Sequence, residues 1–315
     1  MFRISAFVKD AKADDRIKAQ GIISRMKLAN SIAKNIFLFF AMISIFTTVG
    51  IILSLFVNSI GFFQKVTLWE FLTGTEWTPL FADPRFGVLP LITGTLIITV
   101  GALLISVPIG LCSAIYLSEY ARPGVRKVLK PLLEILAGIP SIVYGFFALT
   151  SITPLLQKIL PQTEIFNAAS GSIAVGIMTI PLVSSLSEDA LRAVPDSLRH
   201  GAYALGATKL ETSLGVVVPA AVSGITASFV LAISRAIGET MIVAIASGAK
   251  PSFTLNPLQS VQTMTAFIVQ ASQGDNPHGT VGFYALFAVG MVLFLMTLGL
   301  NILSHHIVQK YRKEY

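Results

Sequence analysis

Long uncharged apolar runs are the feature of this sequence that most constrains its fold. Six runs are long enough to cross a hydrocarbon core of about 30 Å as helices. They lie near 36–58, within 86–118, at 135–157, at 165–187, within 212–249 and near 281–303. With only 12% charged residues, the chain is also too apolar for an ordinary soluble domain of this length. The sequence therefore predicts an all-α integral membrane protein with six transmembrane helices.

Basic residues predict the orientation of these helices, because lysine and arginine prefer cytoplasmic loops. The N-terminal segment, the loops after the second and fourth runs and the C-terminus together carry 18 of the 23 basic residues, whereas the alternate loops carry four. Both termini are therefore expected in the cytoplasm. The net charge of +7 is attributed to this topology and to contact with lipid headgroups, not to nucleic-acid binding.

The pattern predicts three parts: a cytoplasmic N-terminal segment (1–34), a transmembrane domain (35–310) and a short cytoplasmic tail (311–315). The first segment does not have the plan of a signal peptide and is expected to remain in the mature protein. It fits either a helix lying on the membrane surface or a partly disordered tail. A long periplasmic loop, 248–280, contains a stretch with helical spacing, 258–271, that is too short to span.

A second long loop, 188–219, has a soluble composition and reads EDALRAVPDSLRHGAYALGATKLETSLGVVVP. Pro195 followed by an acidic residue and a serine indicates a helix start, and Gly206 indicates a stop and restart. Two short helices joined at Gly206 are therefore expected. Taken alone, so charged a stretch also fits a solvated connector.

The stretch SRAIGETM places Arg235 and Glu239 four residues apart inside the fifth apolar run. A charge at the centre of a membrane helix costs about 2.5–3.5 kcal/mol, so such residues are usually paired or face a cavity. On one helical face the two can neutralise each other. If the helix enters the membrane near Pro219, Arg235 lies about 24 Å along it, near the midplane or beyond.

Two interpretations of this pair remain open. In one, the ion pair only locks two helices together. In the other, which we favour, Arg235 is the cationic contact for an oxyanion, because the guanidinium fork matches phosphate geometry. Glu239 would then hold Arg235 while the pathway is empty. It would also accept a hydrogen bond from the P–OH of protonated phosphate, a proton that sulfate lacks at neutral pH.

Polar residues beside prolines are weaker substrate-pathway candidates. Ser141 follows Pro140, and Thr179 precedes Pro181. Prolines free backbone carbonyls inside a membrane, which can line a cavity, although simple helix kinks are the preferred explanation. The sequence shows no nucleophile–base constellation and no metal-ligand cluster, so an enzyme is not expected.

Several residues of the loop 188–219 reproduce a known spacing, and they are His200, Gly201, Ala202, Gly206, Val216, Val218 and Pro219. Their intervals closely resemble those of the EAA loop in ABC-importer permeases, with His200 where that family usually has glutamate. The resemblance implies a type I ABC-importer permease fold and a loop whose coupling helices dock into an ATPase subunit. The chain contains no Gly-Lys dipeptide and hence no phosphate-binding P-loop, so ATP and Mg would be bound by that partner.

Three further stretches, 71–96, 134–149 and 234–244, resemble the phosphate-specific (Pst) permease family. Met241 after AIGET and the long first outer loop are most similar to its PstC subunits. The resemblance implies a bacterial inner-membrane permease that imports phosphate by alternating access. It also implies a PstA-like paralogous permease, two PstB-like ATPase copies and a PstS-like phosphate-binding protein as partners.

Two alternatives remain open at this point. Within the same class, the substrate could be sulfate, molybdate or phosphonate. From a different class, an ion-gradient-driven anion transporter or an anion channel would use Glu239 as a proton site.

Overall fold

A computed structural model describes residues 2–79, 81, 83–274 and 277–311, with side chains described for 30–304 within these ranges and for His306. The chain divides into two compact units, Met1–Val57 and Asn58–Tyr315. Across the described ranges the regular structure is helical, and Trp77 and Phe86 form one isolated bridge. Five helices are long and apolar enough to cross a membrane, and a bent helix pair makes a sixth. This agrees with the all-α membrane protein expected from the sequence.

Unit 1 consists of one helix. Helix α1 (Phe2–Phe63) runs through it and ends within unit 2. Its segment Asn30–Phe63 is apolar enough to span a membrane and contains the first predicted span. Met1 of the predicted N-terminal segment and 312–315 of the predicted tail lie outside the described residues.

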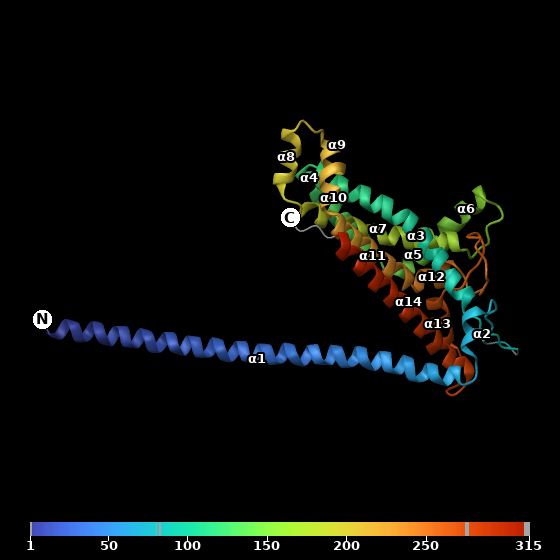
Figure 1. Cartoon of the computed structure of the whole chain (residues 1–315), viewed down its shortest axis with the longest axis horizontal. Helices are drawn as coiled ribbons and strands as arrows, with labels where there is room; N and C mark the ends of the chain where they lie inside the picture. Colours follow the sequence, from blue (N-terminus) through green and yellow to red (C-terminus); the bar gives the residue numbers. More distant parts are fainter. Residues whose placement is uncertain (1, 80, 82, 275–276, 312–315) are drawn as a thin grey trace. The chain divides into compact units, whose positions relative to one another are not determined.

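Four helices run along unit 2 (Figure 1), and they are α3 (Leu89–Ile115), α7 (Ala168–Arg192), α11 (Val222–Ile237) and α14 (Val281–Tyr311). Small residues bring α3 and α7 close together. A side chain at Gly101 would meet Ser172, and one at Gly110 would meet Val183, each at under 3.0 Å. The second, fourth and sixth predicted spans are therefore confirmed as α3, α7 and α14. Helix α7 is longer than expected, because it continues through Arg192.

The third predicted span, 135–157, is wrong at its start. A helix with three basic residues, α4 (Pro123–Ala137), includes its first three residues. The helical structure is interrupted after α4 at Gly138–Pro140, because proline lacks a backbone N–H and disfavours a helical conformation in the residue before it. The span then consists of three successive helical segments, α5 (Ser141–Phe147), η2 (Ala148–Ile152) and α6 (Thr153–Ile159).

The fifth run is not the single helix that the sequence predicted. Three short segments precede a bend of 71°, and they are α9 (Lys209–Thr212), η3 (Ser213–Val217) and α10 (Val218–Ala220). Helix α11 follows and ends at Ile237. A second break over 238–240 precedes α12 (Met241–Ala246). The distance of 24 Å expected from a straight helix starting at Pro219 therefore does not apply.

The two ends of unit 2 carry different elements (Figure 1): α8 (Asp196–Ala204) and α9 lie at one end, α2 (Leu68–Thr73) and α13 (Met264–Gln273) at the other. The turn between α8 and α9 is made by Gly206, whose φ of +83° favours glycine. The two short helices predicted from the sequence are thus present. We call them the α8–α9 pair.

The helix expected over 258–271 begins later, at Met264, where Thr263 caps it by accepting a hydrogen bond from the N–H of Ala266. Its buried face packs into an aromatic cluster. Phe267 lies edge-on to Trp77, with ring centroids 4.9 Å apart. Helix α13 is therefore packed into unit 2.

Candidate functional site

The second break in the fifth span determines where its charged pair lies. Arg235 is in the last turn of α11, where a cation is favoured by the partial negative charge of the helix end. Glu239 lies beyond that end, in the break. The predicted ion pair forms, with Arg235 Nη1 3.0 Å from Glu239 Oε2. It forms across a helix terminus, however, and not along one continuous helical face.

The Arg235 side chain makes few contacts with the other described residues. Its side chain is 50% exposed. Across the described residues it makes one hydrogen bond, from Nη2 to the sulfur of Met178 at 3.6 Å, and a thioether is a weak acceptor. The contact with Glu239 is an ion pair without an aligned hydrogen bond. Most of the guanidinium donors are therefore free for a ligand.

Glu239 has two separate tasks, one for each carboxylate oxygen. Oε1 accepts the N–H groups of Met241 and Ile242 at 3.1 and 3.3 Å, which caps the start of α12. Oε2, which is buried, faces Arg235 and receives no aligned hydrogen bond. The backbone carbonyl accepts the hydroxyl of Thr265 at 2.7 Å, which ties the break to α13. Capping explains why a carboxylate is tolerated there, and the sequence pattern did not show it.

A cavity of about 340 Å³ lies against Arg235, and we call it the Arg235 cavity. Its polar and sulfur-containing lining residues include Lys130, Glu134, Met178, Thr179, Ser185, Glu188 and Arg235. Thr179 lines the same cavity as Arg235. Its hydroxyl, however, donates to the carbonyls of its own helix. Ser141 is the first residue of α5 and is not part of this lining. Both roles stay predictions.

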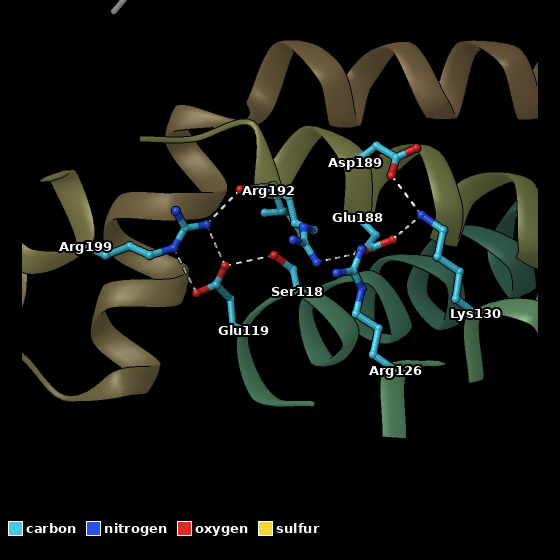
Figure 2. Close-up of polar contacts among 9 residues, drawn as sticks. Ser118, Glu119, Arg126, Lys130, Glu188, Asp189, Arg192 and Arg199 are labelled. Atoms are coloured by element: carbon cyan, nitrogen blue, oxygen red, sulfur yellow. Dashed lines mark hydrogen bonds and ion pairs between the residues drawn. The ribbon is translucent and has the colours of Figure 1, made fainter. Parts of the chain in front are cut away.

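A buried carboxylate on α7 was missed by sequence reasoning. The Glu188 side chain is 0% exposed and contacts the guanidinium of Arg126, while its Oε2 lies 2.8 Å from Lys130 Nζ. Figure 2 shows Lys130 between Glu188 and Asp189. The hydrogen bond from Lys130 to Glu188 raises the pKa of this lysine, so it stays charged. The cluster joins α4 to α7, next to the Arg235 cavity.

A second ionic cluster joins α8 to the rest of unit 2 (Figure 2). Arg199 of α8 donates Nε–H and Nη2–H to the two carboxylate oxygens of Glu119, at 3.3 and 2.9 Å. Its remaining donors bind the carbonyls of Leu191 and Val194 and the carboxylate of Asp196. All five N–H groups are thus used, and the hydrogen bond to Glu119 raises the pKa of Arg199. This arginine fixes α8 against α7 and η1 (Tyr116–Tyr120).

The predicted coupling residues lie on or beside the α8–α9 pair. His200, Gly201 and Gly206 are exposed, Ala202 is half-buried, and Pro219 is exposed in α10. Leu205, at the tip, is 90% exposed, and Leu210 on α9 is 59% exposed. An apolar tip of this kind is a typical protein-contact surface.

Sequence reasoning missed the Glu188 cluster. Lys130 and Glu188 are 58 positions apart, and the α4 charges looked like those of an ordinary cytoplasmic loop. A helical reading of 123–137, with basic residues at 126 and 130 on one face, would have been the available signal.

A known protein family and two named relatives match most of this chain. The chain matches the family "Binding-protein-dependent transport system inner membrane component" over residues 106–313. The probable ABC transporter permease YqgH of Bacillus subtilis (strain 168) is 36% identical over 259 residues, 82% of this chain and 84% of that protein. The phosphate transport system permease protein PstC of Haemophilus influenzae is 33% identical over 291 residues, 86% and 90% of the two chains.

Solved structures agree on the fold. A bacterial ABC transporter involved in the import of the acidic polysaccharide alginate is 15% identical, with a TM-score of 0.59, and the match covers 82% of this chain and 89% of that one. The resemblance to ABC-importer permeases and to the PstC subunits is therefore confirmed. The chain belongs to the binding-protein-dependent transport system inner membrane components: it is a multi-pass inner-membrane permease of an ABC importer, a transport subunit and not an enzyme.

Proposed function

We propose that this permease imports inorganic phosphate. The observation that carries the proposal is the Arg235 guanidinium, half exposed on a cavity wall with most of its donors free. A planar fork of N–H donors suits a tetrahedral oxyanion. Two relatives named phosphate transport system permease protein PstC, which are 30% and 33% identical to this chain, support the same substrate.

Glu239 provides the discrimination in this proposal. Its Oε2 is buried beside Arg235 and has no aligned hydrogen bond, so it can accept one from the P–OH of protonated phosphate. Sulfate carries no proton at neutral pH and would meet only a repelling carboxylate. Thr179 and Ser141 are proposed as further pathway residues, with smaller contributions.

The α8–α9 pair is proposed as the coupling element. Membership of the family implies an ATPase and a substrate-binding protein as partners. We assign the ATPase contact to the exposed face that includes His200, Gly201, Ala202 and Gly206, with Pro219 behind it. Both termini and the segments 1–34, 188–219 and 311–315 then lie in the cytoplasm, and 248–280 lies on the periplasmic side.

The proposed complex contains a PstA-like permease as the second half of a heterodimer, two PstB-like ATPase subunits that hold ATP and Mg, and a PstS-like binding protein. ATP hydrolysis would move the α8–α9 pair and switch the bundle between outward and inward access. Another oxyanion, such as sulfate, molybdate or phosphonate, is the alternative substrate. A secondary anion transporter is the alternative mechanism.

Uptake of labelled phosphate into proteoliposomes carrying the full complex tests this proposal. We expect uptake that requires ATP on the side of the ATPase and that continues in excess sulfate. Uptake without ATP would refute the importer mechanism for this complex. ATP-dependent uptake that sulfate blocks would keep the importer mechanism but refute phosphate as the specific substrate.

A further inference from the structure

A second cavity lies against α4, near the Glu188 cluster. It has a volume of about 540 Å³, and we call it the α4 cavity; its charged lining consists of Arg126, Lys127, Lys130, Glu134 and Arg192. Four cations thus face one carboxylate. A concave site with an excess of one charge concentrates ions of the opposite sign. The cavity is therefore suited to an anion.

The neighbouring carboxylates do not satisfy all of these cations. Glu188 holds Arg126 and Lys130, but Arg192 is 3.9 Å from it and 49% exposed. The described structure shows no ion pair or hydrogen bond for Lys127. The Nε of Arg126 is buried and lacks an acceptor among the described residues. Among the described residues, Lys127 and the Nε of Arg126 thus lack a partner, and Arg192 has only a long ion-pair contact.

The spacing of the basic residues along α4 concentrates positive charge on one side of the helix. Arg126 and Lys130 are four residues apart, where like charges on a helix repel. Glu188, 0% exposed, lies between them and offsets that repulsion. One buried carboxylate therefore holds Arg126 and Lys130 in place and contacts Arg192 only at 3.9 Å.

The α4 cavity is a neighbour of the Arg235 cavity, because the two share lining residues. Lys130 and Glu134 line both it and the Arg235 cavity. An anion that leaves Arg235 toward α4 would therefore meet Lys130 next.

We propose that the α4 cavity is a second oxyanion site, which binds a phosphate group through Arg126, Lys127, Lys130 and Arg192. Two sources can supply this chemistry: free inorganic phosphate on its way out of the Arg235 cavity, or the headgroup of an anionic phospholipid. The first source rests on the proposed function. The second is independent of it.

The test measures binding of labelled phosphate to the complex of permease and ATPase subunits, without the phosphate-binding protein, in nanodiscs of zwitterionic lipid and with a non-hydrolysable ATP analogue. Arg235→Gln is present throughout, so the Arg235 contact does not contribute. We expect the double variant Lys127→Gln, Arg192→Gln to raise the Kd about tenfold, as the loss of charge-assisted hydrogen bonds predicts. Arg122→Gln is the matched control, because Arg122 precedes α4 and is not part of the cavity lining.

A second arm measures how much anionic phospholipid copurifies with each variant. A lower amount with the double variant and unchanged phosphate binding would identify a lipid headgroup as the occupant. If neither phosphate binding nor lipid retention differs between the double variant and the control, the proposal is wrong. Failure of phosphate uptake by the wild-type complex would refute the proposed function alone, since this comparison measures binding with Arg235 already replaced.

Discussion

Arg199 and Arg235 each pair with a glutamate at nearly the same distance, 2.9 and 3.0 Å, yet their surroundings differ. Arg199 is 13% exposed, and all five of its N–H groups have acceptors. Arg235 is 50% exposed, and among the described residues its one hydrogen bond goes to a sulfur atom. A guanidinium with no free donor can only hold structure, whereas one with free donors on a cavity wall can bind a ligand.

The carboxylate partners differ in the same way. Glu119 uses both oxygens on Arg199 and accepts the hydroxyl of Ser118 as well. Glu239 gives one oxygen to the start of α12 and leaves the other beside Arg235 without an aligned hydrogen bond. The first pair is thus expected to govern stability and the second to govern transport.

The largest effect is expected from Arg199→Gln. This change leaves buried Glu119 without a counter-charge and the carbonyls of Leu191 and Val194 without their donor. Breaking a buried pair in this way costs about 3–5 kcal/mol, or a fall in Tm on the order of 10 °C. Thermal denaturation of the purified complex measures it, with exposed Arg122→Gln as the control. An unchanged Tm would show that the Arg199 contacts add nothing to stability.

Arg235→Gln is expected to separate the two pairs most clearly. Loss of a charged contact to the substrate should lower kcat/KM for phosphate about 100-fold. The Tm should fall less than for Arg199→Gln, because Arg235 makes fewer hydrogen bonds, so the lost counter-charge of buried Glu239 is the main stability cost. Arg235→Lys keeps the charge but not the fork and should lie between the two. A Tm loss as large as that of Arg199→Gln would instead make Arg235 structural.

Glu239→Gln keeps an oxygen to cap α12 and removes the negative charge. We expect phosphate uptake to fall about tenfold, in line with a lost hydrogen bond to a charged group. Sulfate should begin to compete, because the repelling charge is gone. Uptake assays with and without sulfate test both points. If uptake and sulfate discrimination both stay intact, Glu239 does not accept a substrate proton.

The smallest effect is expected at the α8–α9 turn. Thr208→Ala removes the hydroxyl that caps α9 and should lower the Tm by about 2–4 °C. Hydrogen bonds from the backbone N–H and the hydroxyl of Thr208 lower the pKa of Glu211. Their stabilising contribution is therefore full above the ordinary carboxyl pKa and lost as the pH falls through the lowered one. The Tm difference between the two proteins should narrow at descending pH, because the bond from the Thr208 hydroxyl to the ionised Glu211 carboxylate is lost while the cap remains. A difference that stays constant with pH would show that this bond adds nothing to stability.

Local patterns predicted part of the molecule well. The two helices around Gly206 follow from punctuation by proline, glycine and a capping threonine, which acts over a few residues. The breaks of the third and fifth spans were missed because the length of an apolar run predicts that it can span a membrane but not that its helix is continuous. Gly138–Pro140 interrupts an uncharged run, and the turn before Met241 interrupts a run that is apolar apart from Arg235 and Glu239.

The sequence by itself determined that this chain is a helical membrane protein, that its fifth span contains an ion pair and that a helix pair follows the fourth span. These depend on apolar length and on short-range spacing. Only the tertiary structure decided that Arg235 has free donors, that Arg199 has none and that Glu188 holds the cations of α4. Such properties depend on which distant side chains meet when helices pack, and no local pattern along the chain carries that information.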